Sequence, residues 1–292
     1  MTRRQFMASA AAAGIAAGAP SAGRPQICIF SKHLGKLNYD QLGRVTREMG
    51  FDGVDLTVRP GGHVLPERVA EDLPRAVDAI RAHGVDVPMI TTGITSAAGP
   101  HVREILATAA KLKIKYYKLG YWMFGKGDPD ADVARVRAEA ERLVALGKSY
   151  GIVAGFHNHS GDYVGYEVRD IREIIRGLDP AYIGYYFDAC HATIEGGLAG
   201  WDIAQRIALK QLKLAAMKDA FWEKKDGKWD VHWCPMGEGM VNWPKVLAAY
   251  AKAGFTGPMS IHVEYEPADE IPATARDLAF LKKQVAAAYG KI

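Results

Sequence analysis

The sequence has few cysteines and little net charge, and each shortage excludes a class of protein. Its three cysteines, Cys28, Cys190 and Cys234, are an odd number, and two of them lie in apolar runs typical of buried strands. A chain of this size buries a core large enough to be stable without disulfide bonds, so a disulfide framework is not expected. The formal net charge is only +4, which does not favour nucleic acid or an anionic membrane surface as a partner.

The first 22 residues have the pattern of an export signal. Arg3 and Arg4 lie in the stretch TRRQFM, and the following ASAAAAGIAAGAPSAG is rich in Ala and Gly and carries no charge. This stretch is too short and too weakly hydrophobic to span a bilayer securely, so we expect cleavage rather than anchoring. The alternative is a frayed basic terminus followed by an Ala-rich helix. The pattern predicts a twin-arginine signal at residues 1–22 and a periplasmic or secreted mature chain, residues 23–292, whose charge without the two arginines is +2.

The mature length is close to the ~250 residues of one (β/α)8 barrel. Short apolar runs alternate with amphipathic stretches that end in Gly-containing turns, as expected for strands alternating with helices. The predicted strands are residues 27–34, 53–58, 85–93, 116–122, 152–159, 183–191, 212–219 and 258–265. Clear helical patterns cover residues 39–50, 100–113, 132–151 and 241–254.

This alternation predicts one α/β domain, a single (β/α)8 TIM barrel, over residues 23–292. A doubly wound open sheet is the alternative fold, but no Gly-rich phosphate loop follows an early strand. The long polar interval 220–243 follows the seventh predicted strand, where a barrel carries active-site loops.

Polar residues collect at the ends of the predicted strands, which is where barrel enzymes place their active sites. A single histidine in such a position is more often a structural residue than a ligand. Many ionisable groups at one end are costly to bury unless they meet a metal or a polar substrate. Strand by strand, these residues are Ser31, Lys32 and His33; Lys118, Tyr121 and Trp122; His157, Asn158 and His159; Asp188 and His191; Lys218 and Asp219; and His262 and Glu264.

The stretch FHNHSGDY at residues 156–163 places two histidines on one side of its strand, because side chains two apart share a face. By the same alternation, His262 and Glu264 point together. If these faces line the barrel interior, a divalent metal can be bound by the set His159, Asp188, His262 and Glu264. Two imidazoles and two carboxylates suit Mn, Zn, Fe or Co better than Ca or Cu. The alternative is a ring of structural hydrogen bonds at the barrel mouth.

Several short motifs, in their order and spacing, give the chain a family resemblance. They are GFDGVDL after the first helix, HNH at the fifth strand, Asp188-x-x-His191 at the sixth, Lys218-Asp219 at the seventh and the ending GFTGPMSIHVEY. Over residues 25–290 the chain resembles the xylose isomerase-like TIM barrels, often named sugar phosphate isomerases/epimerases. The resemblance implies a divalent metal held by Glu, Asp, His and Glu from strands five to eight, and isomerisation, epimerisation or elimination on keto sugars and polyols.

Within that resemblance, only part of the ligand set carries over to this sequence. Asp188 matches the metal ligand of strand six, and His191 matches a histidine that contacts substrate. Ala216 replaces the histidine of strand seven, and His262 stands where the family has its last Glu, with Glu264 further along the same face. The Glu of strand five is replaced by His157 in one alignment and by Gly165 in another.

The chemistry expected of such a site is proton abstraction beside a carbonyl, with the metal stabilising the enediolate. The catalytic candidates are Lys218, His191 and Glu264, and the substrate-binding candidates are His33, Lys118, Trp122 and His157. Lys218 either stabilises the oxyanion or transfers the proton; an ion pair with Asp188 or Asp219 is its structural alternative.

We therefore predict an exported sugar isomerase or epimerase that acts with a divalent metal on a neutral keto-sugar or sugar derivative. A neutral substrate is favoured because phosphorylated sugars are mainly cytosolic and no phosphate cradle is visible. The alternatives are a keto-glycoside lyase or dehydratase and a noncatalytic carbohydrate-binding barrel. A nuclease on this fold would need more His and Glu ligands and a basic groove.

Overall fold

The computed structural model describes residues 23–267 and 269–290. The predicted export signal at residues 1–22 lies outside these residues. Among the described residues, none of the helices combines the length and the apolar character that a membrane crossing requires.

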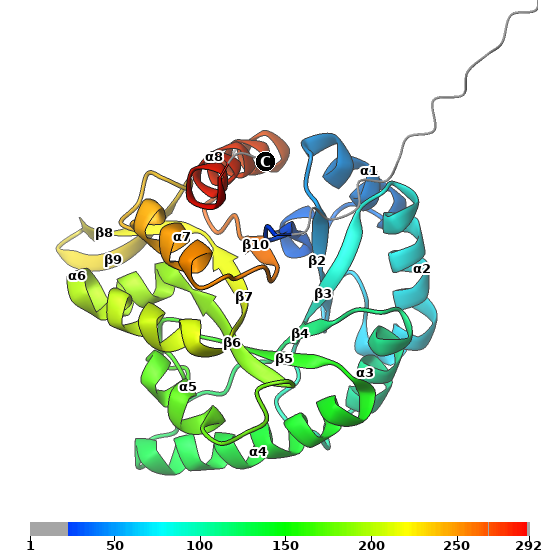
Figure 1. The fold of residues 1–292 in the computed structure, drawn as a ribbon, viewed down its shortest axis with the longest axis horizontal. Coiled ribbons are helices and arrows are strands. Elements are labelled where there is room, and N and C mark those ends of the chain that lie inside the picture. Colours follow the sequence, from blue (N-terminus) through cyan, green and yellow to red (C-terminus); the bar gives the residue numbers. More distant parts are fainter. Residues whose placement is uncertain (1–22, 268, 291–292) are drawn as a thin grey trace, which may run out of the picture.

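Eight parallel strands close into a barrel around which the helices form an outer ring (Figure 1). The order around the barrel is β1-β10-β7-β6-β5-β4-β3-β2. This confirms the predicted (β/α)8 fold, and every barrel strand falls inside one of the predicted runs. The strands are β1 (Ile27–Phe30), β2 (Gly53–Val58), β3 (Asp86–Thr92), β4 (Tyr116–Lys118), β5 (Val153–His157), β6 (Ile183–Asp188), β7 (Leu212–Met217) and β10 (Met259–Ile261).

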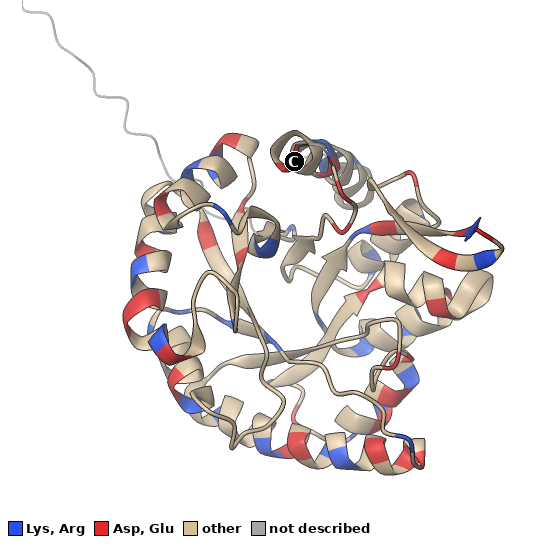
Figure 2. Cartoon of the chain, turned by 180° about the vertical axis from the view of Figure 1, so that it is seen from behind, with Lys and Arg blue, Asp and Glu red and all other residues tan. Residues whose placement is uncertain are grey.

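The helices bury an apolar face against the barrel and leave their charged side chains outside. In α1, for example, Leu42 and Val45 are buried, while Arg44 pairs with Glu48 on the solvent side at 2.9 Å. Figure 2 shows acidic and basic residues interspersed along these outer helices. The helices are α1 (Tyr39–Met49), α2 (Val69–Ala82), α3 (Val102–Lys111), α4 (Pro129–Tyr150), α5 (Val168–Ile175), α6 (Ala189–Ala208), α7 (Trp243–Lys252) and α8 (Glu270–Tyr289).

Inside the barrel, a buried carboxyl group forms the floor beneath the mouth. Asp55 Oδ1 accepts a hydrogen bond from Thr91 at 2.7 Å, and its Oδ2 accepts from Ser260 at 2.9 Å and from Tyr186 at 3.2 Å. Burial raises the pKa of Asp55 to about 6, although these hydrogen bonds act to lower it. Met89, among the apolar side chains that pack around Tyr186, fills the interior alongside this group.

The polar interval after the seventh barrel strand is not an irregular loop but a two-stranded hairpin. Strands β8 (Asp219–Lys225) and β9 (Lys228–Cys234) pair antiparallel beside α6. Asp226 and Gly227 both have positive φ, as a tight Asp-Gly hairpin turn requires. At its base, Asp219 accepts hydrogen bonds from Trp243 Nε1 at 2.8 Å and from the Gly237 amide at 2.9 Å. These bonds fix the base of the hairpin, from which Trp233 of β9 reaches the barrel mouth.

Candidate active site

A cavity of about 230 Å³ opens at the carboxyl ends of the barrel strands. This volume is near the lower end for small-molecule sites, which run from ~300 to ~1,000 Å³, and it suits a ligand the size of a monosaccharide. Charged groups of both signs and three aromatic rings line it. The lining residues are Phe30, Lys32, Arg59, Thr91, Lys118, Tyr121, His157, His159, Lys218, Trp233, His262 and Glu264.

The two histidines of FHNHSGDY both reach this cavity, as the alternation predicts. His157 is the last residue of β5; its Nδ1 lies 2.8 Å from the Tyr121 hydroxyl and its Nε2 lies 3.3 Å from Asp188 Oδ2. His159 lies just beyond the strand, with Nδ1 at 2.9 Å from the Ser160 carbonyl oxygen. Asn158 between them turns away from the cavity and bonds to the backbone N–H and C=O of Asp188.

A buried lysine lies between two carboxylates in one wall of the cavity. Lys218 Nζ is 3.3 Å from Asp188 Oδ2 and 3.9 Å from Glu264 Oε1. The Lys218 and Asp188 side chains are 2% and 0% exposed. Asp188 pairs with Ala216 in the β6–β7 register, so the side chain two residues further, Lys218, faces the same interior. Of the two ion pairs that the sequence leaves open for Lys218, the structure contains the one with Asp188.

Two titratable groups face each other across the cavity. Glu264 follows β10 and Lys118 ends β4, and these strands lie four places apart in the ring of eight. Burial acts to raise the pKa of Glu264, but the positive charges of Lys218 and Lys32 outweigh it, and the net shift is downward. Burial, with the positive charge of Arg59 nearby, holds the pKa of Lys118 well below its usual value. Its Nζ lies 3.4 Å from the centroid of the Tyr121 ring.

The histidines of the mouth are neutral. Burial, reinforced by the positive charges of the nearby lysines, holds the pKa values of His157, His191 and His262 well below the usual range. The same causes lower the pKa of His159 to about 4. His191 Nδ1 lies 2.7 Å from the Ser160 hydroxyl, and its buried Nε2 has no hydrogen-bond partner among the described residues.

The predicted metal set, His159, Asp188, His262 and Glu264, surrounds one mouth but is not assembled as a ligand cluster. Among the residues that the structure describes, no three His, Cys, Asp or Glu side chains are grouped as metal ligands. His262 Nε2 is engaged with the Tyr186 hydroxyl at 3.0 Å, and Lys218 lies beside both carboxylates. A divalent ion there would meet an ammonium at close range. The residues do not fit the metal in this arrangement.

Four of the predicted residues do not line the cavity. His33 Nε2 accepts a hydrogen bond from the Val263 amide at 3.1 Å, behind His262. Trp122 stacks on Phe156 and donates from Nε1 to the Thr95 carbonyl at 3.1 Å. The other two, Asp188 and His191, are buried beneath the wall.

The sequence prediction also omitted three lining residues, Phe30, Thr91 and Arg59. Arg59 directly follows β2, so its position at a strand end was a signal that could have identified it.

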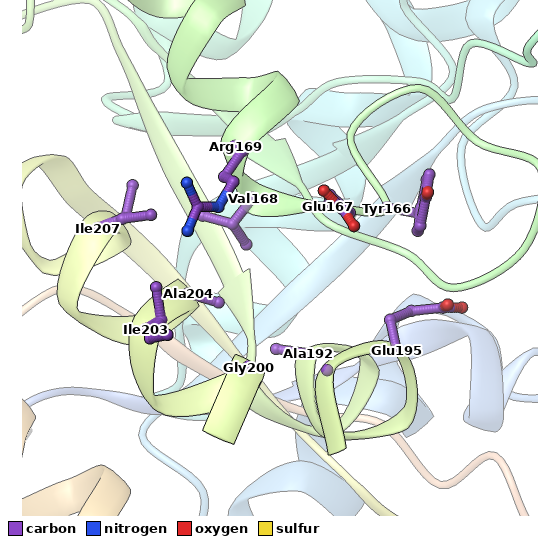
Figure 3. Close-up of a pocket in the computed structure, with 11 residues that line it drawn as sticks. Tyr166, Glu167, Val168, Arg169, Ala192, Glu195, Gly200, Ile203, Ala204 and Ile207 are labelled. Atoms are coloured by element: carbon purple, nitrogen blue, oxygen red, sulfur yellow. The ribbon is translucent and has the colours of Figure 1, made fainter. Parts of the chain in front are cut away.

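A second, smaller cleft of about 120 Å³ lies outside the barrel, between the start of α5 and α6. Figure 3 shows Tyr166, Glu167 and Arg169 on one side of it and the residues of α6, including Glu195 and Ile203, on the other. This cleft lies in the helix layer, away from the strand ends. The mouth of the barrel is therefore the candidate active site.

Comparison with family models and solved structures identifies the family and the fold of this chain. The model described as "Xylose isomerase-like TIM barrel" matches residues 44–284. The chain belongs to this family. No curated protein sequence matches it significantly. The solved structures that it resembles share 12–17% sequence identity with it, and at such identities the likeness shows a common fold alone.

Three solved structures illustrate the likeness. The E. coli 3-keto-D-glucoside 4-epimerase YcjR superposes with a TM-score of 0.70 at 16% identity, over 89% of this chain and 100% of that one. A D-allulose 3-epimerase from Methylomonas sp., in complex with D-allulose, gives 0.69 at 12% identity, over 90% and 98%. A Mycobacterium smegmatis member in complex with magnesium gives 0.65 at 16% identity, over 86% and 89%.

Proposed function

We propose that this xylose isomerase-like barrel is an isomerase, specifically an epimerase, that acts on a small neutral keto-sugar or sugar derivative. The observation that carries the proposal is the placement of Glu264 and Lys118 on opposite sides of one cavity. Epimerisation removes a proton from one face of a carbon and returns one to the other, so it needs two proton-transfer groups that face each other. Solved barrels of the same fold include epimerases of 3-keto-D-glucosides and D-allulose.

The reaction begins with loss of the proton on the carbon beside the substrate carbonyl. The Glu264 carboxylate accepts this proton, and the electrons of the C–H bond move to the carbonyl oxygen to give an enediolate. The Lys218 ammonium stabilises the negative oxygen by donating hydrogen bonds to it. Protonated Lys118 then donates a proton to the opposite face, and the reverse reaction uses the pair in its opposite states. The lowered pKa of Lys118 favours this exchange, since the amine gives up its proton readily.

The remaining lining residues suit a polyhydroxylated ligand. The neutral imidazole of His159, whose Nδ1 lies against the Ser160 carbonyl oxygen, leaves its Nε2 to accept a hydrogen bond from a hydroxyl group. Phe30, Tyr121 and Trp233 supply apolar ring faces for the C–H faces of a sugar.

Hydrogen–deuterium exchange tests the reaction directly. Neutral keto-sugars, among them D-fructose, L-ribulose and methyl 3-keto-glucosides, are incubated with the protein in D₂O and followed by NMR. We expect exchange beside the carbonyl and appearance of the epimer. Glu264→Gln should lower the rate by about 100-fold or more, because it removes the base. Lys118→Met should suppress the epimer more than the exchange.

The control is Glu104→Gln, which changes an exposed carboxylate on α3 and should leave the rate unchanged. Exchange accompanied by loss of water or of the glycosidic group would assign the protein as a lyase. Sugar binding with no exchange in any sample would instead identify a noncatalytic carbohydrate-binding barrel.

We also propose export through the signal at residues 1–22, supported by the TRRQFM motif and the uncharged Ala-rich stretch after it. Conservative replacement of both arginines, Arg3→Lys with Arg4→Lys, should leave an uncleaved precursor in the cytoplasm. An unchanged periplasmic yield of the double variant would contradict the proposal.

A further inference from the structure

Lys218 has an environment that is typical of a bound cation. Its ammonium is buried, lies within salt-bridge distance of Asp188 and Glu264, and is 5.1 Å from the centroid of the Trp233 ring. The nitrogen atoms of two histidines approach the same Asp188 oxygen, His157 Nε2 at 3.3 Å and His191 Nε2 at 3.8 Å. Carboxylates and imidazoles that converge from several strand ends are the donors a transition metal would use. In this chain the two carboxylates converge on an ammonium, and the two imidazoles contact one of those carboxylates.

We propose that Lys218 takes the place of a divalent metal in this barrel: its ammonium excludes the ion and itself supplies the positive charge of the site. The exclusion stands on the arrangement of charges alone. The catalytic part, in which the same ammonium stabilises an enediolate, rests on the proposed function.

Charge balance supports the exclusion. Asp188 and Glu264 contribute two negative charges, and Lys218 lies between them while Lys32 pairs with Glu264 at 3.1 Å. Both carboxylates therefore already have lysine partners. A metal would have to displace a buried ammonium or remain beside it, and like charges at ~4 Å in a partly buried site repel strongly.

Two positions close to this lysine compete little with it for a metal. Ala216 lies level with Asp188 on β6 and with Ser260 on β10, so its side chain faces the barrel interior, yet a methyl group offers no ligand. Across the interior, Tyr186 donates its proton to Asp55 and so accepts from His262 Nε2, which leaves that nitrogen without a free lone pair. Ala216 therefore provides no metal donor, and His262 keeps a lone pair only on Nδ1, which lies 4.0 Å from Glu264 Oε1.

An ammonium in this position has a defined chemical use. Its N–H groups donate to a developing oxyanion, and the low-polarity surroundings of the buried site strengthen that interaction. Unlike a metal, it cannot be removed by a chelator. The proposal therefore joins a binding property, exclusion of divalent ions, to a catalytic one, activity that is insensitive to chelation.

The test uses Co²⁺ as the probe, followed by calorimetry and by its visible absorption spectrum. The wild-type protein is compared with Lys218→Met, with Lys218→Gln as a second variant, and with Lys32→Met as a matched control. Lys32 also pairs with Glu264, but its side chain is 48% exposed and it does not contact Asp188. Circular dichroism establishes that each variant is folded, and Asp188→Asn added to each background identifies binding at this site.

We expect no Asp188-dependent Co²⁺ binding at millimolar concentration in the wild type or in Lys32→Met. Lys218→Met or Lys218→Gln should bind about 100-fold or more tightly than the wild type, because one unit charge is removed at ~4 Å from the ion. Asp188-dependent binding of Co²⁺ by the wild type at micromolar concentration would overturn the proposal. Folded Lys218 variants that bind no better than the wild type would overturn it equally.

These readouts contain no sugar and no turnover, so they remain informative if the proposed epimerase activity fails. Conversely, an active protein that loses its activity on chelation and regains it with Co²⁺ would retain the proposed function and refute this inference.

Discussion

Asn158 ties the end of β5 to β6 from a position between two histidines that line the cavity. Its Nδ2 donates to the Asp188 carbonyl oxygen at 2.9 Å, and its Oδ1 accepts from the Asp188 amide at 2.8 Å. The side chain is fully buried. One amide therefore pairs both backbone groups of the residue whose carboxylate contacts Lys218, and it fixes where that carboxylate points.

We predict that Asn158→Ala mainly destabilises the protein. The substitution leaves two buried backbone groups without partners, which should lower the free energy of unfolding by about 2–4 kcal/mol. His159→Ala should cost less stability, because the side-chain hydrogen bond of His159 is only to the backbone of its own neighbour Ser160. Instead it should lower turnover by about 100-fold if the imidazole contacts the substrate. Urea titrations and the exchange assay measure the two effects.

The contrast between these neighbours decides the direction of their side chains. Full turnover in His159→Ala, together with complete loss of turnover and normal stability in Asn158→Ala, would mean that Asn158 rather than His159 contacts the substrate.

At the scale of elements, the sequence predicts where strands begin better than where they end. The run 183–191 begins with β6 at Ile183, but the strand stops at Asp188. Asp188 Oδ1 accepts a hydrogen bond from the His191 amide at 3.0 Å, so this residue is also the N-cap of α6. Likewise residues 31–34 belong to a 3₁₀ helix after β1. A run of strand-compatible residues does not mark where the chain leaves the barrel.

The β8–β9 hairpin was missed because its sequence is polar and exposed. Lys224, Lys225 and Lys228 lie beside the turn, and most hairpin residues are exposed or half-buried. The available signals were the Asp226-Gly227 pair and the alternation of Trp229, Val231 and Trp233 with polar residues. Its missed strand β9 brings Trp233 to the cavity.

The candidate site could be predicted as a set of residues but not as a set of contacts. Strand alternation correctly placed His157 and His159 on the cavity and turned Asn158 away from it. It could not decide whether Lys218 pairs with Asp188 or Asp219, because that choice depends on the register between β6 and β7. Register is a property of the assembled barrel, and so is the position of a lysine between two predicted metal ligands.

At the scale of the whole molecule, the barrel closes around an ionisable floor. Asp55 on β2 is held by side chains from β3, β6 and β10, so one carboxyl group links four of the strands. Burial raises the pKa of Asp55 from 3.8 to about 6, which makes the charged form unfavourable in the folded barrel. The stability of the fold should therefore depend on pH through this group.

We predict that Asp55 destabilises the barrel as the pH rises. Between about pH 4 and pH 6 the folded state keeps the proton that the unfolded state has lost, so the contribution of Asp55 is fully present below pH 4 and is lost as the pH passes about 6. A shift of about two pKa units corresponds to about 3 kcal/mol. Asp55→Asn lacks this titration, while its amide can still accept from Thr91 and donate to the hydroxyls of Tyr186 and Ser260.

Other groups titrate over the same range, among them Asp277, whose pKa burial also raises to about 6. The quantity to measure is therefore the difference in the free energy of unfolding between Asp55→Asn and the wild type, from urea titrations at pH 4 to 7. This difference should move in favour of the variant by up to about 3 kcal/mol as the pH rises. A difference that stays constant across the range would show that Asp55 binds its proton equally in the folded and unfolded chains, and the floor would then owe its stability to hydrogen bonding alone.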